Sequence, residues 1–156
     1  LQDRGEEELL FVICAGENDI GEGLSLHTSV AALEKLLEMI LGAFQKSYVI
    51  FLGPKFEPWQ EQEGARSIKK KYSKMSRSFQ RCLSRQEDSM YLHYVDCLTM
   101  FCGESAMVPG ATLGGRAKAE FKYFQSDLLH LSIHGYTVWR EVVEQKVIEI
   151  LATRSV

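Results

Sequence analysis

The residue types best suited to acid–base chemistry form two short motifs, one near each end of the sequence. The segment Asp127 to His130 (DLLH) places a carboxylate three residues before a histidine. Such a carboxylate can accept the imidazole Nδ1–H, which sets the tautomer and stabilises the imidazolium formed when Nε2 takes a proton. The segment Gly16 to Asp19 (GEND) offers Asn18, whose amide N–H can point at an oxyanion, behind a glycine that permits a sharp turn.

Each motif also has a purely structural interpretation. Glycine, asparagine and aspartate are the commonest turn residues, so Gly16 to Asp19 taken alone favours a plain turn. Asp127 taken alone favours the cap of a turn, with His130 as an ordinary histidine. The functional interpretation therefore depends on the elements that would position the two motifs.

Apolar patterning predicts alternating strands and helices. Continuous apolar runs predict strands at Leu9 to Ala15, Tyr48 to Leu52 and Met90 to Val95. Apolar residues at three- and four-residue spacing predict helices at Val30 to Phe44, capped by Thr28 or Ser29, at Ile68 to Leu83, and at Ser132 to Leu151. A long loop contains Pro109, Gly110, Gly114 and Gly115.

This order of elements predicts right-handed βαβ units and an α/β fold with a parallel sheet in three layers. The unbroken apolar run LLFVICA at Leu9 to Ala15 predicts a strand buried on both faces. Functional residues of such sheets lie just past the C-terminal ends of the strands. Both motifs lie close to places of that kind.

In their order and context, the two motifs resemble those of the SGNH hydrolase superfamily, the GDSL-type esterases and lipases. Its members have G-x-N-D after the third strand and D-x-x-H before the last helix. The stretches Phe11 to Ser25 and Ser126 to Trp139 look like bacterial GDSL-type esterases and platelet-activating-factor acetylhydrolase-like proteins. The likeness covers nearly the whole chain, and it is loose from about Gly53 to Phe124.

The resemblance implies a three-layer αβα fold with a flavodoxin-like parallel sheet. Residues 1–156 would run from the third strand of a partial domain to its C-terminal helix, with the first two strands absent from this chain. Asn18 matches the oxyanion-hole asparagine of the family, His130 its general base, Asp127 the partner of that histidine, and Gly16 the turn glycine.

Two blocks of the family are missing from the sequence. One is the G-D-S block, which bears the nucleophilic serine. The other is a glycine after the family's own second strand, which donates a backbone N–H. The serines outside any G-D-S context include Ser25, Ser29, Ser126 and Ser132. The strand Leu9 to Ala15 would also expose an unpaired apolar edge, which is an aggregation site. We therefore expect an upstream N-terminal segment or a partner chain to pair with that strand.

The resemblance implies a serine esterase that cleaves a small carboxylic ester without metal or cofactor. The main alternative is a catalytically inactive SGNH-like subunit, retained as a structural or interaction module of a larger assembly. The missing serine favours this alternative, whereas the presence of Asn18, Asp127 and His130 together favours the enzyme. A flavodoxin-like binding domain is disfavoured because no phosphate-cradling glycine loop is present.

Composition limits the remaining classes of function. The chain has 46% hydrophobic and 25% charged residues, which is typical of one soluble globular domain. A formal net charge of -3 argues against nucleic acid as a partner. No apolar stretch approaches the roughly 20 residues of a membrane span. Because the chain starts at Leu1, a targeting signal upstream could have been removed, and the compartment stays open.

Three weaker signals carry no functional prediction. His130 and His134 have a spacing that can bind zinc, but neither H-E-x-x-H nor a third nearby ligand is present. The cysteines are expected to be reduced, with a Cys97 to Cys102 pairing left open. The basic residues of the second predicted helix favour a solvated outer face: Arg66, Lys69, Lys70, Lys71, Lys74, Arg77, Arg81 and Arg85.

Overall fold

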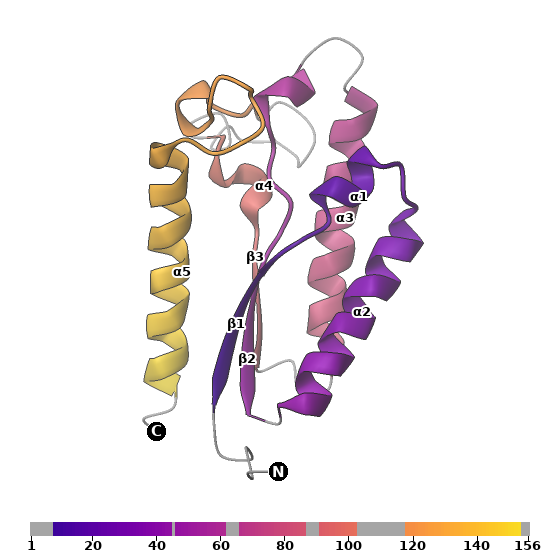
Figure 1. Ribbon diagram of the computed structural model, residues 1–156, viewed down its shortest axis with the longest axis vertical. Coiled ribbons are helices and arrows are strands. Elements are labelled where there is room, and N and C mark those ends of the chain that lie inside the picture. Colours follow the sequence, from indigo (N-terminus) through magenta and orange to yellow (C-terminus); the bar gives the residue numbers. More distant parts are fainter. Residues whose placement is uncertain (1–7, 45, 62–65, 87–90, 103–117, 154–156) are drawn as a thin grey trace. The chain divides into compact units, whose positions relative to one another are not determined.

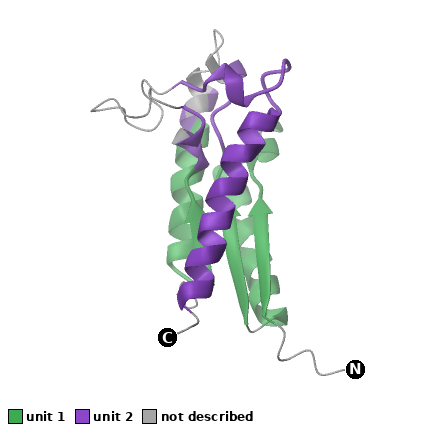
Figure 2. Ribbon diagram, turned by 90° about the vertical axis from the view of Figure 1, so that its left-hand side faces the viewer, with its two compact units in different colours: residues 1–54, 71–96 green, residues 55–70, 97–156 purple. Residues whose placement is uncertain are grey.

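The computed structural model describes residues 8–44, 46–61, 66–86, 91–102 and 118–153 of the chain. The chain divides into two compact units, which have separate colours in Figure 2. The first unit comprises residues 1–54 and 71–96, and the second comprises residues 55–70 and 97–156. The glycine-containing loop expected around Pro109 to Gly115 lies outside the described residues.

The first unit is built on a three-stranded parallel sheet with the order β1-β2-β3 (Figure 1). Its strands are Leu9–Cys14 (β1), Ser47–Leu52 (β2) and Leu92–Val95 (β3). Leu9 lies opposite Ser47 in the first pair, and Val49 lies opposite Leu92 in the second. Helices separate successive strands along the chain, as the apolar patterning predicts. The predicted α/β class and parallel sheet are confirmed.

Three helices accompany this sheet: α1 (Glu17–Gly21), α2 (Leu26–Ala43) and α3 (Arg66–Ser84), of which residues 71–84 belong to the first unit. The sequence did not predict α1, since five residues are too few to show a helical period. The expected cap of α2 at Thr28 or Ser29 is wrong. Ser25 is the N-cap, because its backbone is extended and its hydroxyl accepts the Thr28 N–H at 3.1 Å.

Helices α2 and α3 lie on one side of the sheet, and aromatic contacts fasten α3 to it (Figure 1). The rings of Phe51 in β2 and Phe79 in α3 meet edge to face with centroids 5.3 Å apart. The hydroxyls of Ser76 in α3 and Tyr94 in β3 are 2.7 Å apart. The apolar stripe predicted for α2 is buried at Leu33, Leu37 and Ile40. The core of this unit therefore lies between β2 and the two long helices.

The prediction that the first strand is buried on both faces is wrong. Burial alternates along β1, and the side chains of Leu10 and Val12 are 41% and 48% exposed. In contrast, Val49, Ile50 and Phe51 in β2 are fully buried. The reason is position: among the described strands β1 pairs only with β2, so it lies at the edge of the sheet. An apolar run indicates that a strand favours burial, but it does not show whether a neighbouring strand is present to cover it.

The second unit contains α4 (Cys97–Met100), α5 (Ile133–Thr153) and two 3₁₀ turns at Pro58–Glu61 and Phe121–Tyr123. Its aromatic side chains gather around Phe101, which is fully buried. Ring centroids of Tyr123, Phe124 and Trp139 lie 5.7, 5.8 and 6.3 Å from that of Phe101. This cluster ties the start of α5 to the segment that precedes it.

Two further expectations from the sequence concern disulfide bonds and membrane-spanning helices. All four cysteines fall within the described residues, and none of them forms a disulfide bond. Cys102 Sγ instead donates to the backbone carbonyl of Leu98 at 3.5 Å. Across the helices that the structure describes, none combines the length and the apolar character that a membrane crossing requires.

Candidate functional site

The D-x-x-H motif lies in a tight loop directly before α5. The loop closes where Phe124 and Leu131 form an isolated antiparallel bridge. Within it, Gln125 N donates to the His130 carbonyl at 2.8 Å. Leu128 turns the backbone through the left-handed region, with φ at 61°. This turn allows the side chains at positions 127 and 130 to meet.

Asp127 holds His130 through three hydrogen bonds. Its Oδ2 is 2.6 Å from the His130 Nδ1, and its Oδ1 accepts the backbone N–H groups of Leu129 and His130, each at 3.0 Å. The predicted contact between the carboxylate and Nδ1 is confirmed. Because both carboxylate oxygens are bonded, the imidazole is held in position relative to the backbone.

The same hydrogen bonds favour the negatively charged form of Asp127. The hydrogen bond from His130, followed by those from the Leu129 and His130 backbone, lowers the pKa of Asp127 to about 2. Asp127 is therefore a carboxylate at neutral pH and accepts the Nδ1 proton. Nε2 is then the nitrogen left to take up a proton, and the His130 side chain is 65% exposed.

Backbone contacts fix the loop to the start of α5. Ser132 caps the helix, since its Oγ accepts the Gly135 N–H at 3.3 Å and donates to the Lys122 carbonyl at 2.8 Å. Ser132 N donates to the Tyr123 carbonyl at 2.9 Å. The predicted start of the last helix near Ser132 is thus confirmed. The loop that carries Asp127 and His130 is therefore joined by hydrogen bonds to the first turn of α5.

The G-x-N-D motif lies directly past the end of β1, as expected. Gly16 has φ at 102° and leads into α1, so Asn18 is in the first turn of that helix with its side chain exposed. Residues 14–19 line an open hollow of about 280 Å³ at this strand end. The amide of Asn18 is therefore accessible at the C-terminal edge of the sheet.

Gly16 is also required for packing, because an added Cβ would lie 2.6 Å from Phe79 Cε2 and 3.0 Å from Met75 Sδ. We expect Gly16→Ala to lower the free energy of unfolding by about 2–4 kcal/mol, through strain at positive φ and the steric overlap. Urea denaturation measures this. The matched control is Gly23→Ala, where φ is 79° and nothing lies within 4 Å of the added Cβ. Equal losses in the two variants would contradict the packing argument.

Asn18 belongs to the first unit, and Asp127 and His130 belong to the second. The structure therefore brings Asp127 and His130 together and describes Asn18 separately. That Asn18 and His130 share one crevice stays a prediction, as do the roles of all four residues, Gly16 included.

The loop after β2 holds a buried charged pair that the sequence did not predict. Lys55 Nζ lies 2.9 Å from Glu57 Oε1, with the two side chains 8% and 0% exposed. Trp59 donates its indole N–H to Glu57 Oε2 at 2.5 Å. The only sequence signal is a Lys-x-Glu pair between two prolines, Pro54 and Pro58, and such pairs are usually exposed.

The zinc spacing of His130 and His134 has no support among neighbouring side chains. His134 stacks on the ring of Tyr123 with centroids 5.6 Å apart. Within the described ranges, no group of three or more His, Cys, Asp and Glu side chains could hold a metal ion. His130 is engaged by Asp127 instead.

Comparison with known proteins supports the fold. No family model and no curated protein sequence matches the chain. It is similar to a solved structure from Streptococcus pneumonia, provisionally described as a platelet activating factor, with a TM-score of 0.66 and 18% identity. The similarity covers 88% of this chain and 58% of that chain, so this chain spans little more than half the length of that protein. At this identity the likeness shows an α/β fold, consistent with three αβα layers.

Proposed function

We propose that residues 1–156 form the C-terminal part of an SGNH-type hydrolase domain and supply the base, its carboxylate partner and an oxyanion donor for ester cleavage. The hydrogen bond between Asp127 and His130 Nδ1 carries the proposal. The two backbone N–H groups bonded to Oδ1 are those of an ordinary turn around an aspartate. The support is the further contact of Oδ2 with Nδ1, which orients an exposed imidazole and which such a turn does not need.

In the proposed reaction, the nucleophile is a serine from a segment outside these 156 residues. His130 Nε2 takes the serine proton as the oxygen attacks the ester carbonyl, while Nδ1–H stays bonded to Asp127. The amide N–H of Asn18 donates to the tetrahedral oxyanion. The imidazolium then protonates the leaving alkoxide, and water repeats the two steps on the acyl-serine.

The edge strand is where that outside segment would attach. β1 pairs with β2 alone among the described strands, and Leu10 and Val12 are half exposed on one of its faces. An added parallel strand would cover the apolar edge that β1 otherwise presents. The greater length of the similar structure supports this, because this chain covers only 58% of it.

The test is hydrolysis of p-nitrophenyl acetate by the 156-residue chain and by a product extended with the encoded upstream sequence. We expect the chain alone to be inactive, because without a triad nucleophile most of the rate enhancement is lost. The extended product should turn over the ester. Turnover by the 156-residue chain would contradict the missing nucleophile, and an extended product that has a G-D-S block yet stays inactive would favour the structural-subunit alternative.

A further inference from the structure

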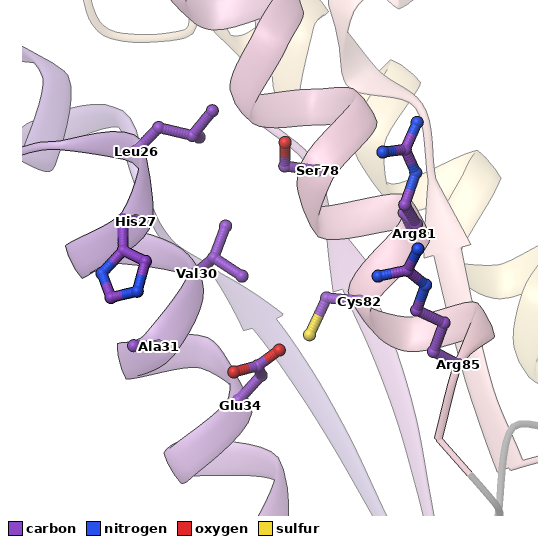
Figure 3. Close-up of a pocket in the computed structure, with 9 residues that line it drawn as sticks. All are labelled: Leu26, His27, Val30, Ala31, Glu34, Ser78, Arg81, Cys82 and Arg85. Carbon is purple, nitrogen blue, oxygen red and sulfur yellow. The ribbon is translucent and has the colours of Figure 1, made fainter.

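Two hollows lie along α3 in the first unit. The first has a volume of about 600 Å³ and lies between α2 and α3 (Figure 3). The second has a volume of about 340 Å³ and lies between α3 and the segment that joins α1 to α2. Leu26 lines both hollows. The two hollows, which share Leu26 and lie along the same helix α3, are together called here the α2–α3 groove.

The α3 side of the groove is cationic. Its lining includes Lys71, Lys74, Ser78, Arg81 and Arg85, which recur at spacings of three and four residues and so form one stripe along the helix. The stripe is about 21 Å long at 1.5 Å per residue. All four cationic side chains are exposed, and among the described residues none of the four makes an ion pair.

The opposite wall is mainly apolar. Leu26 and Val30 of α2 point toward α3 across the first hollow in Figure 3, and Ala31 of α2 also lines it. Ile20 and Leu24 line the second hollow, and Leu24 is 46% exposed. The groove thus offers an apolar wall beside a row of positive charge, the combination that suits an amphipathic ligand.

Other polar groups on the groove leave its charge positive. Glu34 is the one acidic side chain among the described lining residues, and His27 lies on the same helix. Burial raises the pKa of the Cys82 thiol, and the nearby Glu34 carboxylate raises it further, so this side chain stays neutral at the bottom of the groove. An anionic ligand therefore meets four cations and one carboxylate.

We propose that the α2–α3 groove binds an acidic amphipathic helix of a partner protein. A helix presents acidic groups at the same three- and four-residue spacing as the cationic stripe, and its apolar residues fit the wall of α2. A membrane surface fits less well because the groove is concave. A nucleic acid fits less well because the described lining has no aromatic ring other than His27 and the whole chain carries a net charge of -3.

None of the proposed ester-cleaving residues lines the groove, and the proposal does not depend on them. The stripe lies on α3, which packs on β2 and β3 through Phe79 and Ser76, whereas the edge strand is β1. Pairing of an upstream segment with β1 would therefore leave α3 with the same partners in the sheet.

The test is fluorescence anisotropy with a labelled peptide of about 18 residues, about 27 Å long as a helix, in which Glu and Leu recur at helical spacing. The full chain is titrated near physiological ionic strength. We expect saturable binding that a scrambled peptide of the same composition lacks. Lys74→Glu with Arg81→Glu should weaken binding by about tenfold or more, because two cations of the stripe become acidic.

The matched control is Lys70→Glu with Arg77→Glu, which makes the same charge change at exposed positions of α3 that line neither hollow. Its affinity should stay within about threefold of the parent. Ala31→Trp, which fills the apolar wall without altering charge, should also weaken binding. Equal binding of the scrambled peptide, or an equal loss in the control, would overturn the proposal. So would binding of phosphatidylserine vesicles or oligouridylate without binding of the helical peptide.

Discussion

Replacing His130 with alanine in the upstream-extended product should lower kcat for p-nitrophenyl acetate by roughly 10⁴-fold or more. Asp127 would then orient no base, and the attacking serine would lose its proton acceptor. Turnover is followed as release of p-nitrophenolate. The effect should fall on kcat rather than on KM, because His130 accepts the serine proton in the transition state and does not bind the ester in the ground state.

The matched control for this variant is His27→Ala, which removes an exposed histidine of α2. Its activity should be close to that of the parent. Circular dichroism shows whether each variant keeps its helices. If folded His130→Ala kept more than about a tenth of the parent rate, a triad base at this position would be untenable, since base removal costs far more.

Replacing Glu57 with alanine should lower the free energy of unfolding by about 3–5 kcal/mol, the usual cost of breaking a buried ion pair by removing one partner. Lys55 would keep its ammonium in a site where its side chain is 8% exposed, now without Glu57 Oε1 at 2.9 Å. The indole N–H of Trp59 would lose its acceptor as well. The ammonium and the indole N–H each lose a bond to a carboxylate, and losing a charged partner costs more than the pair itself contributes.

Urea denaturation measures this loss, and two variants define its origin. Lys35→Ala removes the exposed pair with Glu38, whose side chains are 70% and 63% exposed, and should cost no more than about 1 kcal/mol. The double replacement Lys55→Met with Glu57→Leu should recover part of the stability, since both charges of the pair are then gone while the Trp59 indole still lacks its Glu57 acceptor. A Glu57→Ala cost as small as that of Lys35→Ala would show that burial does not strengthen the first pair.

Local spacing determined much of what could be predicted from sequence. The carboxylate of Asp127 meets His130 Nδ1 because three residues of loop can close such a contact without help from distant parts of the chain. The start of the last helix at Ser132 follows from capping chemistry within one turn. The parallel order of β1, β2 and β3 follows from alternating apolar periodicities and the geometry of crossovers.

Neighbours distant in sequence decided the rest, because burial is a property of surroundings and not of a residue type. β1 reads as a fully buried strand, yet Leu10 and Val12 are exposed since β1 is at the edge. Lys55 and Glu57 read as surface charges, yet they are enclosed. The basic stripe of α3 is interpreted from sequence as a solvated face, and its side chains are indeed exposed. The hollow beside the stripe depends on α2 as well, because a concave surface needs two elements.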